Sequence, residues 1–303
     1  MAHQPEQLAG VGSVDLSETQ ALVTGSTSGT GRETALALGR LGADVMVHGR
    51  DAAAGETVVD ELTAMGREAT FQKADFASVD DVRDLAAAVG EWTDDLDVLC
   101  NNAGGLFRDG RLTDLGVEYT FHVNHLAPYL LTTELLSTLA DDARIVTTSS
   151  GAHRGVELDF EAIESVDSYS GVRAYQRSKL ANVLFSTELA HRLDRTGRSS
   201  APNAFHPGAI PGSGFSRFLP GPLPRLFAAL DRLPMTTTVA EGASTAVYLA
   251  ASPRVDGLSG RYFADCEPKE PSAAARDRTT QRQLWERSAE LLEIDEPLAD
   301  ANT

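Results

Sequence analysis

Tyr175 and Lys179 form the first pair in this sequence whose types and spacing suggest chemistry. The chain has only three lysines, Lys73, Lys179 and Lys269, and one of them stands four residues after a tyrosine. On a helix, positions i and i+4 share a face, so the two side chains would lie together. A lysine ammonium stabilises tyrosinate and lowers the pKa of the phenol towards the range useful for acid–base catalysis. The alternative for this motif, taken alone, is an ordinary helix pair.

Three further polar residues favour the catalytic interpretation. Ser149 and Ser150 end the strand-like run RIVTTSS, where a hydroxyl can hydrogen-bond a substrate carbonyl while Tyr175 delivers a proton. Asn124 lies inside the apolar stretch FHVNHLAPYLL, where a buried amide needs partners. It would hold a water against Lys179 or act as a structural cap or kink. The histidines show no metal-ligand spacing, so no metal site is predicted.

A glycine-rich turn, VTGSTSGTGRE, follows the first strand-like run. Gly25, Gly29 and Gly31 allow the backbone to turn tightly and approach a pyrophosphate, which the N-terminus of the next helix would bind. The sequence NNAG at 101–104 follows the fourth strand and would lie at the same sheet edge. Asp75, after the third strand, would accept from an adenine amino group or cap the following helix.

The end of the second strand predicts which dinucleotide is bound. Sites that select NAD place an acidic residue there for the ribose hydroxyls, whereas this sequence has Gly49 followed by Arg50. Arg50 and Arg32 would hold a 2′-phosphate with their planar guanidinium groups, unless both are merely solvated. The sequence therefore predicts NADP in preference to NAD.

Strand-like and helical runs alternate from residue 19 onward. Strands joined by helices of ten or more residues indicate parallel strands with right-handed crossovers. The predicted fold is α/β, a single Rossmann-type, doubly wound, mostly parallel sheet of about seven strands flanked by helices. Pro202 conflicts with an internal strand, so that strand would begin at Asn203 or contain a bulge. The longest helices are expected at 112–140 and 172–195, and a further one near 280–293.

The predicted organisation is a polar N-terminal tail at 1–18 and one dinucleotide-binding catalytic domain at 19–295. That domain includes a Pro- and Gly-rich segment at 207–238 with many large apolar side chains. Such a segment is typical of a mobile lid over a lipophilic substrate. A short helix packed on the core, or an oligomer contact, is an equally weighted alternative.

The charge of the chain excludes some partners. With 44 acidic and 26 basic residues the net charge is −18, which repels nucleic acid and anionic membranes. An acidic surface with little lysine also suggests a high-salt cytosol, and urea unfolding at low and molar KCl tests this hypothesis. Two cysteines, no signal-peptide pattern and no apolar run of ~18 residues predict a cytoplasmic protein without a membrane anchor.

Taken in order, TGxxxGxG, NNAG, the helical asparagine, the serine and YxxxK resemble the short-chain dehydrogenase/reductase family from about residue 19 to 293. The segments NHLAPYLLT, TTSSGAH, AYQRSKLANVLFSTELA, FHPG, SGRYFADC and LWERS are similar to its branch of retinol dehydrogenases and the WW-domain oxidoreductase. The resemblance implies an NADP(H)-dependent oxidoreductase that interconverts an alcohol with an aldehyde or ketone, here a lipophilic one. A cofactor-binding sensor without turnover is the alternative.

The resemblance also implies roles for individual residues. Tyr175 would donate and accept the proton, and Lys179 would lower its pKa and hold the nicotinamide ribose. Ser150 would polarise the carbonyl, and Asn124 would anchor a relay water. Gly212 stands where the family often has a threonine, so that pyrophosphate contact does not carry over. The residues expected to bind cofactor are Gly25, Ser28, Gly29, Thr30, Gly31, Arg50, Asp75, Phe76, Asn102, Ala103, Gly104, Tyr175, Lys179, Pro207, Gly208 and Ile210.

The resemblance extends to assembly. Many relatives pair the two long helices, here at 112–140 and 172–195, across a dimer, so a homodimer or homotetramer is expected. The partner predicted at the active site is a small carbonyl or alcohol.

Overall fold

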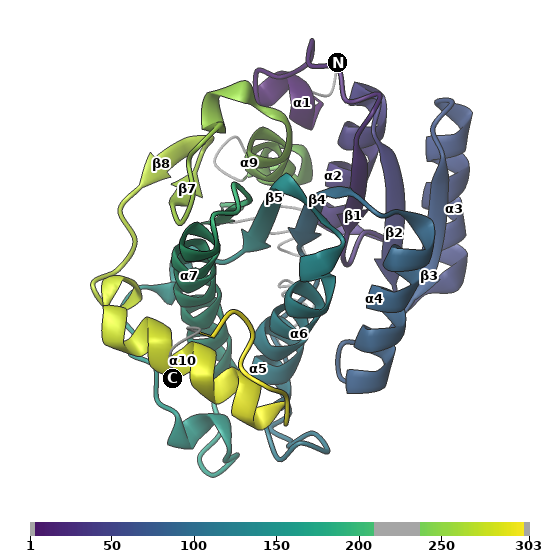
Figure 1. Ribbon diagram of the computed structural model, residues 1–303. Helices are drawn as coiled ribbons and strands as arrows, with labels where there is room; N and C mark the ends of the chain where they lie inside the picture. Colours follow the sequence, from purple (N-terminus) through teal and green to yellow (C-terminus); the bar gives the residue numbers. More distant parts are fainter. Residues whose placement is uncertain (1–3, 209–236, 300–303) are drawn as a thin grey trace.

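The computed structural model describes residues 4–208 and 237–299 (Figure 1). These residues form one eight-stranded sheet in the order β3-β2-β1-β4-β5-β6-β7-β8. Neighbouring strands are parallel except β7 and β8, which are antiparallel. The strands are β1 Gln20–Val23, β2 Asp44–Gly49, β3 Ala69–Lys73, β4 Leu96–Asn101, β5 Leu139–Thr148, β6 Ala201–Phe205, β7 Tyr262–Ala264 and β8 Glu267–Lys269. The predicted α/β, mostly parallel fold is confirmed, with β8 as one strand more than expected.

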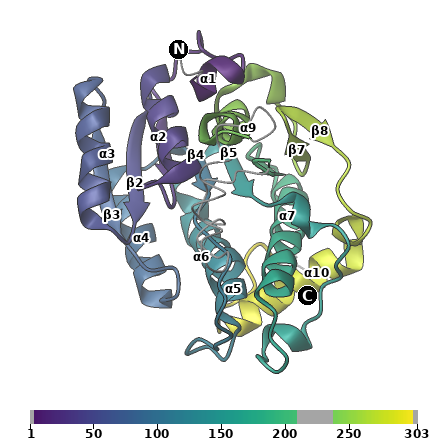
Figure 2. The same cartoon turned by 180° about the vertical axis from the view of Figure 1, so that it is seen from behind.

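Helices cover both faces of the sheet, and the strand side chains alternate between them (Figures 1 and 2). In β1, Ala21 and Val23 join the apolar layer under α2, α3 and α9, whereas Leu22 joins the layer under α4, α6, α7 and α10. The helices are α1 Pro5–Leu8, α2 Gly29–Leu41, α3 Ala52–Ala64, α4 Val79–Trp92, α5 Tyr119–Phe121, α6 Ala127–Glu134, α7 Gly171–Thr196, α9 Val239–Ala251 and α10 Arg278–Leu291.

The order of the strands places a switch point between β1 and β4. The chain adds β2 and β3 on one side of β1 and then crosses over to β4 on the other side. In doubly wound sheets, ligands bind in the crevice at the carboxyl ends of the strands at such a point. Here β1 leads into the glycine turn and β4 leads into NNAG, so both predicted binding segments meet there.

The helix predicted at 112–140 is wrong at both ends. The helical residues run from Tyr119 to Ser137, and β5 already begins at Leu139. Within them, His122–Leu126 form a π-helical turn closed by a hydrogen bond from the Ala127 N–H to the His122 carbonyl. Pro128 explains this π turn, because proline has no N–H to donate to the carbonyl of Asn124, four residues earlier.

Pro202 is the second residue of β6, so the predicted start at Asn203 is also wrong. The carbonyl of Pro202 accepts from the Gly260 N–H, whereas the pairing of β6 with β7 begins only at Ala204 and Tyr262. The N–H and C=O of one strand residue point to the same side. The missing N–H therefore faces the region before β7 starts, where the ladder does not need it.

Residues 5–18 are not a free polar tail. Helix α1 lies beside α9 and α2 in both views (Figures 1 and 2), and Val11 is buried in the same apolar layer. The Glu6 carboxylate is buried and accepts two hydrogen bonds from the Arg40 guanidinium, at 2.6 and 2.9 Å. A paired charge and a few apolar contacts fix this segment without any helical periodicity in the sequence.

Helix α10 packs across α6 and α7 (Figure 1). Its Trp285 is buried, with its ring centroid 4.9 Å from that of Tyr129 and 5.9 Å from that of Phe185. The two helices expected to pair across a dimer are therefore covered on this side by their own chain. A homodimer or homotetramer stays a prediction, and a contact through this side would require α10 to move away.

Candidate active site

Asn102 ties the glycine turn to the end of β4. Its side-chain amide donates to the carbonyls of Thr24 and Gly25, at 2.8 and 3.3 Å, and its Oδ1 accepts from the Thr30 hydroxyl at 3.2 Å. Gly25 has a φ of +65°, and a Cβ there would lie 2.8 Å from the Ala103 Cα. At Gly31 a Cβ would lie 2.3 Å from the Asn102 Nδ2. These two glycines are needed for the close approach of the two segments.

The N-terminus of α2 differs from those of the other long helices in the described chain. Helices α3, α4, α7, α9 and α10 each begin with a side-chain cap, from Asp51, Ser78, Ser170, Thr238 and Asp277 respectively. Ser28, at the same position of α2, makes no capping hydrogen bond and is exposed. The first-turn amides of α2 are thus left for an anion, which is what a dinucleotide pyrophosphate requires.

His48 supports the glycine turn from beneath, a role the sequence reasoning missed. The Gly25 N–H donates to its Nδ1 at 3.1 Å, and its Nε2 lies 3.2 Å from the Ala74 carbonyl. The hydrogen must therefore be on Nε2, and the ring is neutral. Burial lowers the pKa of His48 to about 4, and the ring stacks on Phe76 at 4.6 Å. The only feature of the sequence that could have indicated this role is the position of His48 near the end of the second strand.

The neutral His48 makes stability depend on pH. Its folded pKa of about 4 lies below the ordinary value of 6.5, so the unfolded chain binds more protons as the pH falls through this window. Between about pH 7.5 and pH 5.5, His48 alone should lower the free energy of unfolding by about 1.4 kcal/mol. His48→Asn keeps an acceptor near Gly25 and cannot titrate. Urea unfolding at both pH values should show that much less acid destabilisation in the variant, and an equal loss in both proteins would refute this role of His48.

The two arginines predicted to hold a 2′-phosphate differ in the structure. Arg32 is bonded to both oxygens of Glu61, at 2.6 and 2.7 Å, so its charge is already paired. Arg50 lies next to the end of β2 with its side chain 62% exposed, 3.7 Å from a carboxylate oxygen of Asp75. Arg50 is thus the better candidate, and Arg32 does not fit the predicted clasp.

Asp75 and Phe76 form the turn after β3. Asp75 does not cap α4, which is the work of Ser78; instead its Oδ1 accepts from the Ala77 N–H at 3.1 Å. The Phe76 side chain is buried against His48. The capping alternative for Asp75 is therefore wrong, and its other carboxylate oxygen faces Arg50.

Tyr175, Lys179 and Ser150 lie together, as expected for a catalytic group. The Ser150 side chain interacts with Tyr175 and acts to lower the pKa of its phenol. The Lys179 Nζ is 5.7 Å from the centroid of the tyrosine ring and donates to the Thr148 carbonyl at 3.0 Å. Ser149 points elsewhere, because its buried hydroxyl donates to the Lys179 carbonyl at 2.7 Å. Of the two serines, only Ser150 is placed to act with the tyrosine.

Burial shifts the pKa values of this pair towards their neutral forms. It raises the pKa of Tyr175, an effect that the interaction with Ser150 only partly offsets, and it lowers the pKa of Lys179 to about 8. The expectation that Lys179 pulls the tyrosine pKa down is therefore wrong for the net shift. At neutral pH the phenol is protonated, the form that can donate a proton.

Asn124 stands in the π-helical turn and braces three segments. Its Oδ1 accepts from the Gly105 N–H at 2.8 Å, while its Nδ2 donates to the Gly105 carbonyl and the Ser178 hydroxyl, at 2.8 and 2.9 Å. A Cβ on Gly104 would lie 2.7 Å from Asn124 Oδ1 and 3.6 Å from Lys179 Nζ. The Asn124 side chain therefore has a structural role, which was the alternative to holding a water. Its carbonyl cannot receive the helical bond from position 128, which is proline.

The remaining predicted site residues are only partly described. Pro207 and Gly208 follow the end of β6, with Gly208 exposed at a φ of +79°. Ile210 and most of the predicted lid lie outside the described residues, since 209–236 are not described. Over the described ranges, no helix is both long and apolar enough to cross a membrane.

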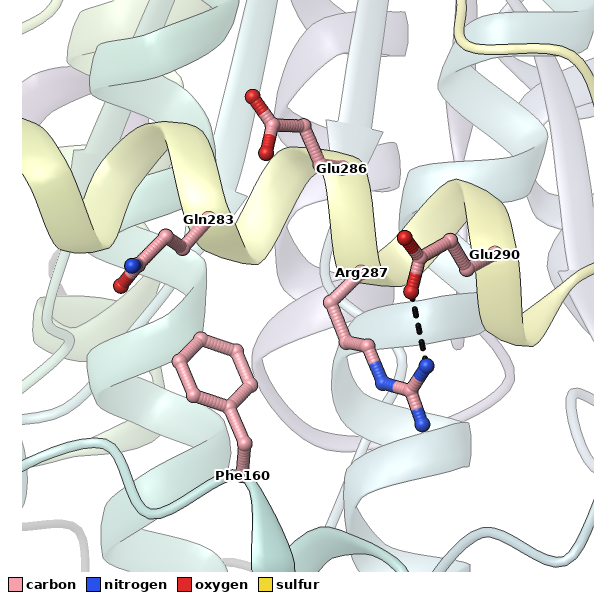
Figure 3. Close-up of a pocket in the computed structure, with 5 residues that line it drawn as sticks. All are labelled: Phe160, Gln283, Glu286, Arg287 and Glu290. Carbon is pink, nitrogen blue, oxygen red and sulfur yellow. Dashed lines mark hydrogen bonds and ion pairs between the residues drawn. The ribbon is translucent and has the colours of Figure 1, made fainter.

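A shallow pocket of about 250 Å³ lies on the outer side of α10 (Figure 3). It is lined by Phe160 and by polar side chains of the helix, where Arg287 is paired with Glu290 at 2.8 Å and with Glu164. It contains none of the predicted site residues. The site at the switch point is the better candidate.

Comparisons with known proteins agree with this geometry. The chain matches the short chain dehydrogenase family over residues 19–216. It is 39% identical over 288 residues to retinol dehydrogenase 14 of Mus musculus, covering 90% of this chain and 85% of that protein. The crystal structure of an uncharacterized protein from Mycobacterium paratuberculosis has a TM-score of 0.75 at 29% identity, covering 94% and 97% of the two chains. A short chain dehydrogenase from Burkholderia cenocepacia J2315 in complex with NADP has a TM-score of 0.67 at 26% identity, covering 82% and 96%.

Proposed function

The chain belongs to the short-chain dehydrogenase/reductase family and is an oxidoreductase acting on CH–OH groups, and from this premise we propose that it is an NADP(H)-dependent reductase of lipophilic aldehydes or ketones. The observation that carries the proposal is the placement of Ser150 and Tyr175 together beside the buried Lys179 at the carboxyl edge of the sheet. Its retinol dehydrogenase relatives support the lipophilic substrate class.

The residues at the switch point fit a dinucleotide. The uncapped start of α2 and the glycine turn would hold the pyrophosphate, and Lys179 would hold the nicotinamide ribose. When bound, the cofactor supplies or accepts the hydride. Ser150 would donate a hydrogen bond to the substrate carbonyl and hold its oxygen near the phenol of Tyr175. Tyr175 would give that oxygen its proton during reduction and take it back during oxidation.

Lys179 and Asn124 would act around that proton transfer. The Lys179 ammonium would stabilise the tyrosinate left after the proton has moved, since Lys179 is buried and its Nζ lies 5.7 Å from the centroid of the tyrosine ring. Asn124 holds Gly105 and Ser178 in place, and its backbone carbonyl would be the acceptor for a relay water.

We extend the proposal to the location of the protein. Its net charge of −18 supports a cytoplasmic protein in a cell with a high salt concentration.

NADPH is expected to bind more tightly than NADH, because Arg50 is the exposed guanidinium at the end of β2. Arg50→Ala should raise the Kd for NADPH by about tenfold or more, the loss of a charge-assisted phosphate contact, and leave the Kd for NADH within twofold. Arg32→Ala is the matched control, since Glu61 already pairs that residue. Tighter NADH binding by the wild type, or equal effects of both variants, would contradict the NADP preference.

The function itself is tested by NADPH and NADH consumption at 340 nm, in molar KCl, with aliphatic, aromatic and isoprenoid aldehydes and ketones. Turnover would establish a reductase and show whether its substrates are lipophilic. Tight NADPH binding with no turnover on any of these compounds would favour a cofactor-binding sensor instead.

A further inference from the structure

Beyond the catalytic group itself, we propose that His153 is a positioning residue that holds the Ser150 hydroxyl in place for Tyr175. The proposal rests on the proposed function, because it assigns His153 a role through the carbonyl-binding serine. His153 is fully buried and lies in the short 3-10 turn Gly151–His153, directly after Ser150.

The hydrogen bonds of His153 fix its tautomer. Its Nδ1 lies 2.7 Å from the Ser150 carbonyl, which can only accept, so the hydrogen is on Nδ1. Its Nε2 accepts from the Ser272 N–H at 3.1 Å. Both ring nitrogens are therefore used, one on the serine and one on the segment between β8 and α10. This neutral imidazole ties Ser150 to a part of the chain more than a hundred residues away.

The turn that carries Ser150 depends on this tie. The Ser150 carbonyl also accepts from the His153 backbone N–H at 3.1 Å, and the Ser150 hydroxyl accepts from the Ala152 N–H at 3.2 Å. The last contact leaves the hydroxyl hydrogen for another acceptor. The ring and the backbone N–H of His153 both bind this carbonyl, so they would resist rotation of the turn and keep the Ser150 hydroxyl near Tyr175.

An aromatic cluster extends the tie towards the cofactor side. The His153 ring meets the Tyr262 ring edge-on at 4.8 Å, and the Tyr262 hydroxyl is 2.6 Å from Nδ1 of His206, the residue before Pro207. The charged residue next to His153 in the chain is Arg154, whose guanidinium donates to the Glu270 carbonyl. His153 thus stands where the serine turn, β7 and the segment before α10 meet.

Three variants separate positioning from folding. His153→Phe keeps the ring against Tyr262 and removes both hydrogen bonds. His153→Asn places an amide N–H near the position of Nδ1 and retains the bond to Ser150, whereas His153→Gln reaches only the position of Nε2, near Ser272. His153→Phe should lower kcat by about 10- to 100-fold, with KM and the Kd for NADPH within threefold. His153→Asn should recover kcat to within about fivefold of the wild type, and His153→Gln should not.

The decisive control places His153→Phe in the Ser150→Ala background. A residue that acts through Ser150 should cause no further loss of kcat once that hydroxyl is gone. A kcat of His153→Phe within threefold of wild type, equal impairment of the Asn and Gln variants, or full additivity with Ser150→Ala would each overturn the proposal. If His153→Phe does not fold, the Asn and Gln variants still decide. Loss of activity in neither Ser150→Ala nor the His153 variants would instead overturn the proposed role of Ser150 itself.

Discussion

Tyr175→Phe is expected to lower kcat for carbonyl reduction by about 10³-fold while leaving the Kd for NADPH within threefold. Phenylalanine keeps the aromatic ring near Lys179 and removes only the group that carries the proton. General acid catalysis by a positioned side chain contributes about 10²- to 10⁴-fold, which sets the size of the effect. Steady-state kinetics and fluorescence titration with NADPH measure the two quantities separately.

Tyr169→Phe is the matched control for this variant. Tyr169 precedes α7, and its hydroxyl donates to the Phe107 carbonyl at 2.8 Å and lies 3.1 Å from the Thr120 hydroxyl. Its loss should change kcat by less than about tenfold, because its hydroxyl is bound to the Phe107 carbonyl and the Thr120 hydroxyl and serves to hold a loop. Turnover retained by Tyr175→Phe, or equal losses in the two variants, would remove Tyr175 from the mechanism.

The raised pKa of Tyr175 bears on how each direction of catalysis should depend on pH. Burial raises the pKa of Tyr175, so the phenol is protonated at neutral pH and suited to reduction. Oxidation needs the tyrosinate and should therefore be favoured at higher pH. Burial lowers the pKa of Lys179 to about 8, so this group is an ammonium at neutral pH and loses its charge as the pH rises above that value.

The fold could be predicted from the sequence because its signals are local. The alternation of strand-like and helical runs, and the glycines after β1, depend on residues that are neighbours along the chain. The errors came where a distant partner decided the structure. The helix predicted at 112–140 ran too far because the chain from Leu139 onward pairs with β4 as part of β5. The N-terminal segment was placed outside the domain because its anchor, Arg40, lies in α2.

The site shows the same division. The spacing of Tyr175 and Lys179 placed them on one helical face, and the structure brings Ser150 to them. Sequence could not show that Arg32 is taken by Glu61, since that pair joins α2 and α3. It could not show either that His48 and His153 support the glycine turn and the serine turn. A histidine's role depends on what each ring nitrogen meets, and both meet backbone groups that the sequence does not mark.

Ser150→Ala, compared with Ser149→Ala, is the second large effect expected, and the pair tests the assignment of the carbonyl-binding role to Ser150 and not to its neighbour. Ser150 faces Tyr175, so its loss removes a donor to the developing charge on the carbonyl oxygen and should lower kcat by about 10²- to 10³-fold. Ser149 is buried, with its hydroxyl on the Lys179 carbonyl. Its loss should lower the free energy of unfolding by about 1 kcal/mol and change kcat by less than about tenfold.

The two variants should therefore differ in which quantity changes most, kcat or the free energy of unfolding. Kinetics should single out Ser150, and urea unfolding should single out Ser149, because one hydroxyl faces the reacting atoms and the other ties β5 to α7. The Kd for NADPH serves as the common control and should stay within threefold in both variants. If Ser149→Ala proved the slower enzyme, the serine turn would have to rotate in the working state, and the hydrogen bonds that hold Ser150 towards Tyr175 would not describe the catalytic arrangement.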